Sequence, residues 1–203
     1  MPTSEKPYHH GNLRAALLNA SLLLIREQGS QGFTLREVAR RAGVSHTAPY
    51  RHFKDREDLL AAVAEEGFLR LARDIEVAVK TALDPLKRLT LAGLAYLTFA
   101  LDQPEHFQVM FSLQFGSTHT ASKEAADAAF GKLVAIVEQC QKAGLLKQYK
   151  LATAARIAWA HVHGVADLTV RRQLGFKSSK EILTFANEAL EASQFGMAQS
   201  QAI

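Results

Sequence analysis

Cysteine and long apolar runs are both scarce in this sequence of 203 residues. The single cysteine, Cys140, excludes an intrachain disulfide and argues against a structural zinc site. The longest uncharged, mostly apolar stretch is the 13 residues from Leu89 to Leu101, whereas a membrane-spanning helix needs about 20. The first 30 residues contain no apolar core followed by a small-residue cleavage site, so we expect no signal peptide. These absences predict a soluble, cytoplasmic protein without a membrane partner.

Signatures of catalysis are also missing from the sequence. It contains no glycine-rich phosphate loop, no Gly-x-Ser-x-Gly, no His-Glu-x-x-His and no paired cysteines. His161 and His163 are two residues apart and would point to different faces of a helix, and His106 and His119 show no ligand spacing either. We therefore predict that the protein is not an enzyme and has neither a metal site nor a cofactor.

Positive charge is concentrated at the start of the chain. Residues 1–54 contain eight lysine and arginine residues against three acidic ones, a net charge of +5, whereas the remainder carries −1. A basic segment joined to a near-neutral body favours a polyanion-binding head on a carrier. The alternative is chance, because a charge of +5 over 54 residues is modest.

Apolar residues recur at helical spacing along nearly the whole chain, and no convincing strand pattern is present. Thr34 and Asp84 have the position of N-caps, and Gly29 and Gly43 follow the ends of apolar stretches. The polar residues 116–122 are expected to form a loop. The pattern predicts an all-α fold with helices, caps included, over residues 13–28, 34–42, 45–52, 55–81, 84–101, 104–115, 123–143, 151–173 and 179–193.

The segment 34–53 has the features of a DNA-reading helix-turn-helix. Gly43 permits the positive φ that the tight turn needs, and Ser45 is expected to cap the second helix and offer a phosphate seat. Polar side chains in the second helix are best placed for base edges, and those at its far end for phosphate oxygens. The candidate DNA-contacting residues are Thr34, Arg36, Ser45, His46, Thr47, Tyr50, Arg51, His52, Lys54 and Arg56.

A family resemblance lies in the same residues. TLREVARRAGVS at 34–45, YRHF at 50–53 and DREDLL at 55–60 resemble the N-terminal DNA-binding domain of the TetR/AcrR family of bacterial transcriptional regulators. The resemblance implies an all-helical homodimer. Its three-helix DNA-binding head is expected over residues 10–70, and a C-terminal helical domain that binds a small effector and dimerises is expected over 71–196.

Three residues depart from the family pattern. Many relatives have a small residue where Thr47 stands and an aliphatic residue where Pro49 stands. Because proline cannot donate the first helical hydrogen bond, we expect the recognition helix to begin irregularly. Arg56 stands where many relatives have lysine, and the resemblance implies a backbone phosphate contact for it.

The segment Trp159–Gly164, WAHVHG, resembles the signature of the WHG class of C-terminal domains in these regulators. Trp159 and His163 are four residues apart and share a helix face. Large aromatic side chains on several helices, with His163 as the one polar group, favour an apolar effector cavity, whereas plain core packing is the alternative for each single residue. The candidate effector-binding residues are Tyr96, Phe99, Phe107, Met110, Phe111, Phe115, Trp159 and His163.

The helix predicted over 151–173 is apolar or small on nearly all sides, so it needs two partners. One partner is the core of the body. The other is expected to be the same helix and the 182–190 segment of a second subunit, in a two-fold, four-helix interface. The candidate interface residues are His161, Gly164, Leu168, Ile182, Phe185 and Ala189.

The sequence thus favours a DNA-binding transcriptional regulator, a repressor that a small, largely apolar effector releases from its operator. The expected partners are double-stranded operator DNA, the effector and a second copy of the chain. The alternative is a non-switching co-regulatory or DNA-organising protein whose C-terminal domain only dimerises. An apolar cavity in the body would discriminate between these two hypotheses. The operator, the effector, the regulated genes and the sign of regulation stay open at this point.

Overall fold

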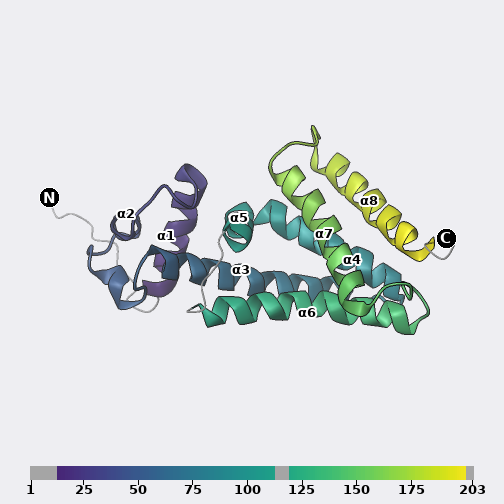
Figure 1. The fold of residues 1–203 in the computed structure, drawn as a ribbon. Coiled ribbons are helices and arrows are strands. Elements are labelled where there is room, and N and C mark those ends of the chain that lie inside the picture. The colour runs from purple at the N-terminus through teal and green to yellow at the C-terminus, as the bar shows by residue number, and fades with distance from the viewer. Residues whose placement is uncertain (1–12, 113–118, 200–203) are drawn as a thin grey trace. The chain divides into compact units, whose positions relative to one another are not determined.

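A computed structural model describes residues 13–112 and 119–199 of the chain, with the side chains of residue 112 and of residues 195–199 excepted. Every regular element in these ranges is a helix (Figure 1), which confirms the predicted all-α fold. The elements are α1 (Leu13–Gln28), α2 (Leu35–Arg41), the 3₁₀ turn η1 (Ala48–Arg51), α3 (Arg56–Val79), α4 (Pro85–Asp102), α5 (Pro104–Ser112), α6 (Thr120–Lys142), α7 (Leu151–Val170) and α8 (Ser179–Gln199).

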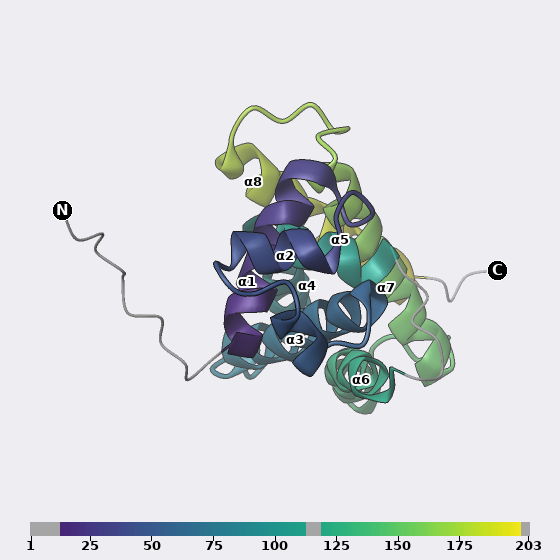
Figure 2. The same cartoon turned by 90° about the vertical axis from the view of Figure 1, so that its left-hand side faces the viewer.

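The chain forms two compact units, one up to Val63 and one from Ala64, so the division falls within α3. The boundary predicted from the sequence follows residue 70. In the first unit, α1 packs on α2 (Figure 2). Helix α2 also contacts η1. In the second unit, α4 is the central helix and contacts α5, α6, α7 and α8, while α7 also contacts α6 and α8 (Figure 1).

Helices α2 and α4 begin at the N-caps predicted for them, Thr34 and Asp84. Thr34 Oγ1 accepts a hydrogen bond from the Glu37 N–H, and the Glu37 carboxylate accepts one from the Thr34 N–H. Asp84 Oδ1 accepts the N–H of Leu86 at 2.8 Å, and Pro85 takes the first helical position. These side chains satisfy the N–H groups that the first turn of a helix leaves unpaired, so local sequence alone sets where these helices begin.

Helix α7 ends at Val170, three residues earlier than predicted. Arg172 adopts φ 57°, and its N–H donates to the Thr169 carbonyl at 2.9 Å, while the Gln173 N–H donates to the Leu168 carbonyl at 2.9 Å. A closing turn of this kind normally has glycine at the position of Arg172. Because arginine is found there instead, the sequence does not indicate that the helix ends at Val170.

None of the described helices combines the length and apolarity that a membrane crossing requires. Cys140 is fully buried in α6, as its place in an apolar stripe predicts. Burial raises the pKa of the Cys140 thiol to about 11. The thiol is therefore protonated at neutral pH and acts as a small apolar side chain.

Candidate nucleic-acid interface and ligand pocket

The turn of the helix-turn-helix depends on the backbone at Gly43. Its φ is 69°, a value that side-chain-bearing residues rarely adopt. The Gly43 N–H donates to the Arg40 carbonyl at 3.2 Å and the Val44 N–H to the Ala39 carbonyl at 3.0 Å, which closes α2 in a Schellman turn. A Cβ at position 43 would meet no atom within 4 Å, so glycine is needed here for its backbone and not for space.

The second helix of the motif is a single 3₁₀ turn. Ser45 does not cap it as predicted, because the Ser45 hydroxyl lies 3.2 Å from the Thr47 hydroxyl and no side chain caps η1. Pro49 is buried in the turn, and its carbonyl accepts the N–H of His52 and of Phe53, each at 2.9 Å. The irregular start expected from Pro49 is confirmed, since proline supplies no N–H for an α-helical bond.

Nine of the ten candidate DNA-contacting side chains are exposed. They come from the cap and first turn of α2, from the turn, from η1 and from the residues that follow it. Tyr50 leaves 54% of its surface in solvent, so its hydroxyl is free to reach an acceptor or donor outside the chain. The exposed residues are Thr34, Arg36, Ser45, His46, Thr47, Tyr50, Arg51, His52 and Lys54.

Arg56 is the tenth candidate, and it is half-buried. Its guanidinium donates to the Ser30 carbonyl and, at 2.7 Å, to Gln31 Oε1, which ties the start of α3 to the turn between α1 and α2. Five N–H donors are available on a guanidinium, so this structural role leaves donors for a phosphate. Arg41, in contrast, forms a two-point ion pair with Glu27.

A pocket of about 500 Å³ lies within the second unit. Its wall is almost wholly apolar and is built from all six helices α3 to α8. It is lined by Phe68, Leu71, Ile75, Leu89, Ala92, Gly93, Tyr96, Phe111, Ala126, Asp127, Ala129, Phe130, Leu133, Arg156, Ala158, Trp159, Ala160, His161, Val162, Leu190, Ser193 and Gln194.

Three of the predicted effector residues line this pocket, namely Tyr96, Phe111 and Trp159. Phe99, Phe107 and Met110 are buried and do not belong to its lining. Phe115 lies outside the described residues. The sequence pattern therefore identified the aromatic region of the second unit. It did not distinguish the residues that line the pocket from those buried in the core.

His163 lies behind the pocket wall. Its Nδ1 is 2.7 Å from the Tyr96 hydroxyl, and its ring lies 4.6 Å from the ring of Phe111 and 5.7 Å from that of Trp159, centroid to centroid. Burial lowers the pKa of His163, although the charge of Asp167 opposes this shift. Burial also raises the pKa of Tyr96, with a hydrogen bond to Trp159 as an opposing effect. His163 is thus a neutral group that orients the Tyr96 side chain.

Seven of the nineteen lining residues outside the predicted effector set are alanine, glycine or serine. Ala126, Ala129 and Ala158 leave space because they fill so little of it. A Cβ at Gly93 would lie 2.8 Å from the Leu190 methyl carbons, so α4 and α8 approach closely at the pocket. Small residues inside an apolar stripe were the available signal, but the same residues serve equally well for close helix packing.

The candidate dimer residues fall into two groups. His161 Nε2 donates to the Ala189 carbonyl at 3.0 Å, and the Phe185 ring lies 5.1 Å from that of Phe176, so these residues hold their own subunit together. Leu168 is 40% exposed, and a Cβ at Gly164 would meet no atom within 4 Å. Ile182 is half-buried on α8.

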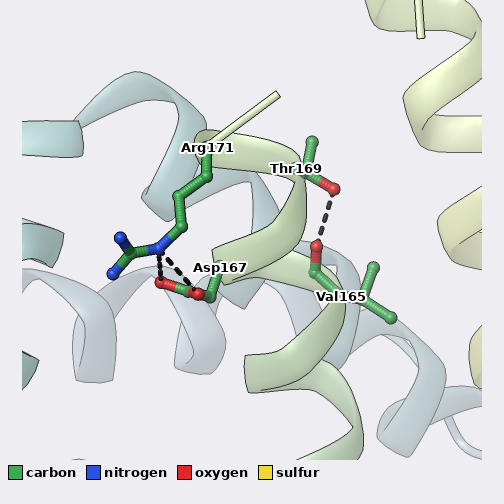
Figure 3. Close-up of polar contacts among 4 residues, drawn as sticks. All are labelled: Val165, Asp167, Thr169 and Arg171. Atoms are coloured by element: carbon green, nitrogen blue, oxygen red, sulfur yellow. Dashed lines mark hydrogen bonds and ion pairs between the residues drawn. The ribbon is translucent and has the colours of Figure 1, made fainter. Parts of the chain in front are cut away.

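Polar side chains at the end of α7 bond within their own helix (Figure 3). Arg171 Nε donates to both carboxylate oxygens of Asp167 at 2.8 Å, and Thr169 Oγ1 donates to the Val165 carbonyl at 2.6 Å. The polar residues on either side of Leu168, Asp167 and Thr169, therefore already have hydrogen-bond partners within α7 or at its C-cap. Leu168 itself is an exposed apolar residue.

The described residues thus combine an exposed helix-turn-helix in one unit with a helical bundle that encloses a pocket in the other. Residues 17–63 match the family model "Bacterial regulatory proteins, tetR family", and residues 89–191 match "Tetracyclin repressor-like, C-terminal domain". The chain belongs to the TetR family of bacterial transcriptional regulators. This confirms the family resemblance read from residues 34–60, while the WHG class stays a prediction.

Curated relatives and solved structures resemble this chain over different lengths. The HTH-type transcriptional regulator BetI of Rhizobium meliloti is 34% identical over 111 residues, 55% of this chain and 54% of that protein. The chain spans about half the length of the curated relatives it matches. A Rhodococcus sp. RHA1 protein of unknown function has a TM-score of 0.79 at 36% identity, covering 96% of this chain and 100% of that one.

A more distant structure shares the fold alone. The transcriptional regulator FadR from Bacillus subtilis, solved in complex with stearoyl-CoA, has a TM-score of 0.75 at 16% identity. The comparison covers 90% of this chain and 98% of that one.

Proposed function

We propose that this protein is a repressor that binds operator DNA through its first unit and is released by a small molecule bound in its second. The observation that carries the proposal is the exposed polar surface around the Gly43 turn and η1, in a chain of this family. The proposed division of labour assigns DNA binding to residues 10–70 and effector binding with dimerisation to residues 71–196.

In this proposal, the short η1 turn brings polar side chains to the major groove. His46 and Thr47, just before η1, and Arg51, its last residue, read base edges, because all three are exposed. Tyr50, His52 and Lys54 bind phosphates at its far end, and the hydroxyl of Ser45 binds one at its start. Thr34, Arg36 and Arg56 complete the phosphate contacts.

The protein acts as a homodimer in this proposal. Gly164 and Leu168 on α7, with Ile182 on α8, supply an apolar face with room for close backbone approach. His161, Phe185 and Ala189 support that face from within the subunit. Two-fold pairing presents two DNA-binding units to sites about one helical turn of DNA apart, or a multiple of it.

Release by an effector requires two states with different spacing of the two DNA-binding units. The pocket is the natural effector site, because its apolar wall favours an apolar ligand by roughly 25 cal/mol per Å² buried. FadR provides a precedent of the same fold with a ligand bound. The pocket also favours this reading over the alternative of a non-switching co-regulator, which needs no cavity.

Two measurements test the proposed function. The full-length protein should select a defined sequence from random duplexes, and Lys54→Ala should weaken binding to all sequences and lower the salt slope by about one unit. Lys80→Ala, which removes an exposed lysine just beyond α3, is the control and should leave both unchanged.

His46→Ala and Thr47→Ala should instead change which sequence is selected. If no duplex is selected over random DNA, the proposed function is wrong. If Lys54→Ala binds as tightly as the unaltered protein at two salt concentrations, Lys54 does not contact phosphate.

A further inference from the structure

Three polar groups in the pocket wall already have partners within the chain. The Tyr96 hydroxyl is bound to His163, and His161 Nε2 is bound to the Ala189 carbonyl. The side-chain amide of Gln194 donates to Thr90 Oγ1 at 3.0 Å. These three groups are therefore not the first choice of a ligand for a hydrogen bond.

The charged lining residues are Arg156 on α7 and Asp127 on α6. Neither forms an ion pair or hydrogen bond among the described residues, so they are not each other's partners within 4 Å. Each lies one helical turn before an aromatic residue of the wall, Trp159 for Arg156 and Phe130 for Asp127, and these two rings are in contact at 6.0 Å. Both residues are exposed, so both charges lie at the solvent-facing rim of the pocket, beside its aromatic residues.

The two charges differ in how their own helices compensate them. Lys123 lies four residues before Asp127 and shares its helix face, so a cation is within reach of that carboxylate. Arg156 has only Ala152, Thr153, Trp159 and Ala160 at the corresponding positions, none of them acidic. Arg156 is therefore the lining charge that has no opposite charge one turn away on its own helix.

We propose that the ligand of this pocket is an amphiphile with an apolar body and an anionic head, whose head binds Arg156. This rests on the proposed function, since it names the chemical class of the effector. The body fills the apolar space among α3, α4, α6 and α8, and the head, a carboxylate or a group of like charge, pairs with the guanidinium in the two-point geometry that arginine favours. The pocket volume of about 500 Å³ is within the range that accepts a ligand of drug-like size.

Trp159 makes the proposal directly measurable, because it is the only tryptophan of the chain and lines the pocket. Its fluorescence is titrated with dodecanoate, dodecanol and dodecyltrimethylammonium, kept below micelle-forming concentrations. These probes share one apolar chain and differ in the charge of the head. Dodecanoate should bind roughly tenfold more tightly than dodecanol, as expected for a charge-assisted hydrogen bond, and the cation most weakly.

Arg156→Gln should abolish the preference for dodecanoate over dodecanol, and Arg156→Lys should retain part of it. Asp127→Asn should leave or increase that preference. Arg73→Gln, which removes an exposed cation of α3 outside the lining, is the matched control and should change nothing.

The proposal is overturned if dodecanol binds as tightly as dodecanoate, if the cation binds best, if Arg156→Gln keeps the preference, or if no probe binds. None of these measurements uses DNA, so they are independent of the proposed repressor function. If dodecanoate binds through Arg156 but does not weaken the binding of selected DNA, the ligand class stands and the release step of the proposed function fails.

Discussion

His106 is a buried imidazole on α5 whose Nε2 has no hydrogen-bond partner among the described residues. Glu66 Oε1 on α3 lies 3.8 Å away, which is too far for a hydrogen bond. Burial lowers the pKa of His106, and Arg70 adds to this effect, while Glu66 and Glu105 oppose it. The neutral imidazole is therefore the form that the fold favours.

This lowered pKa predicts that stability falls on acidification. Above the unfolded value of about 6.5, His106 is neutral in both states and its full contribution is present. As the pH falls below 6.5 towards the folded pKa, the unfolded chain binds a proton that the folded chain does not, so the free energy of unfolding decreases. Urea unfolding at pH 7 and pH 5.5 measures this slope, and His163 contributes in the same direction.

His106→Gln should make the pH dependence shallower, because glutamine does not titrate. Glu66→Gln should make it steeper, because it removes the charge that favours protonated His106. Equal slopes in all three proteins would contradict the assignment of the pH dependence to this histidine.

At the scale of elements, two helical glycines have opposite surroundings. Gly131 in α6 has no atom within 4 Å of an added Cβ, whereas at Gly93 in α4 the Leu190 methyl carbons lie 2.8 Å away. Alanine in a helix interior is favoured over glycine by about 1 kcal/mol. Gly131→Ala should therefore raise the free energy of unfolding by about this amount.

Gly93→Ala should not show that gain, because the new methyl group displaces Leu190 and offsets it. We expect its free energy of unfolding, measured in urea, to lie at least about 1 kcal/mol below that of Gly131→Ala. Leu190 lines the pocket, so the same change should also weaken dodecanoate binding. Identical unfolding curves for the two variants would show that α4 and α8 do not pack tightly at this point.

At the scale of the whole molecule, the proposed dimer predicts a concentration-dependent mass. Light scattering at micromolar concentration should give the mass of two chains. Leu168→Asp should raise the dissociation constant roughly a hundredfold, because it buries a charge in the interface. Leu69→Asp is the control, since Leu69 is a similarly exposed leucine, at 49%, on α3 outside the proposed face. A monomeric unaltered protein would contradict the dimer and, with it, the two-headed binding of DNA.

Helix positions and caps were predictable from the sequence because their causes are local. Thr34 with Glu37, Asp84 with Pro85, and Gly43 each act within a few residues, so their spacing carries the information. The helix-turn-helix and its family follow from the same short-range pattern. The irregular start of η1 was likewise predictable from Pro49, because the missing N–H is a property of proline itself.

The pocket and its polar contacts depend on residues that are far apart in the chain. Tyr96 and His163 are 67 positions apart, and nothing in either segment indicates that His163 binds a hydroxyl and lies behind the wall. Whether an aromatic residue lines a cavity or fills the core depends on the size of what faces it from another helix, as Gly93 and Leu190 illustrate. Arg156 was not a candidate in the sequence for the same reason. Its place in the pocket lining depends on residues that are distant in the chain.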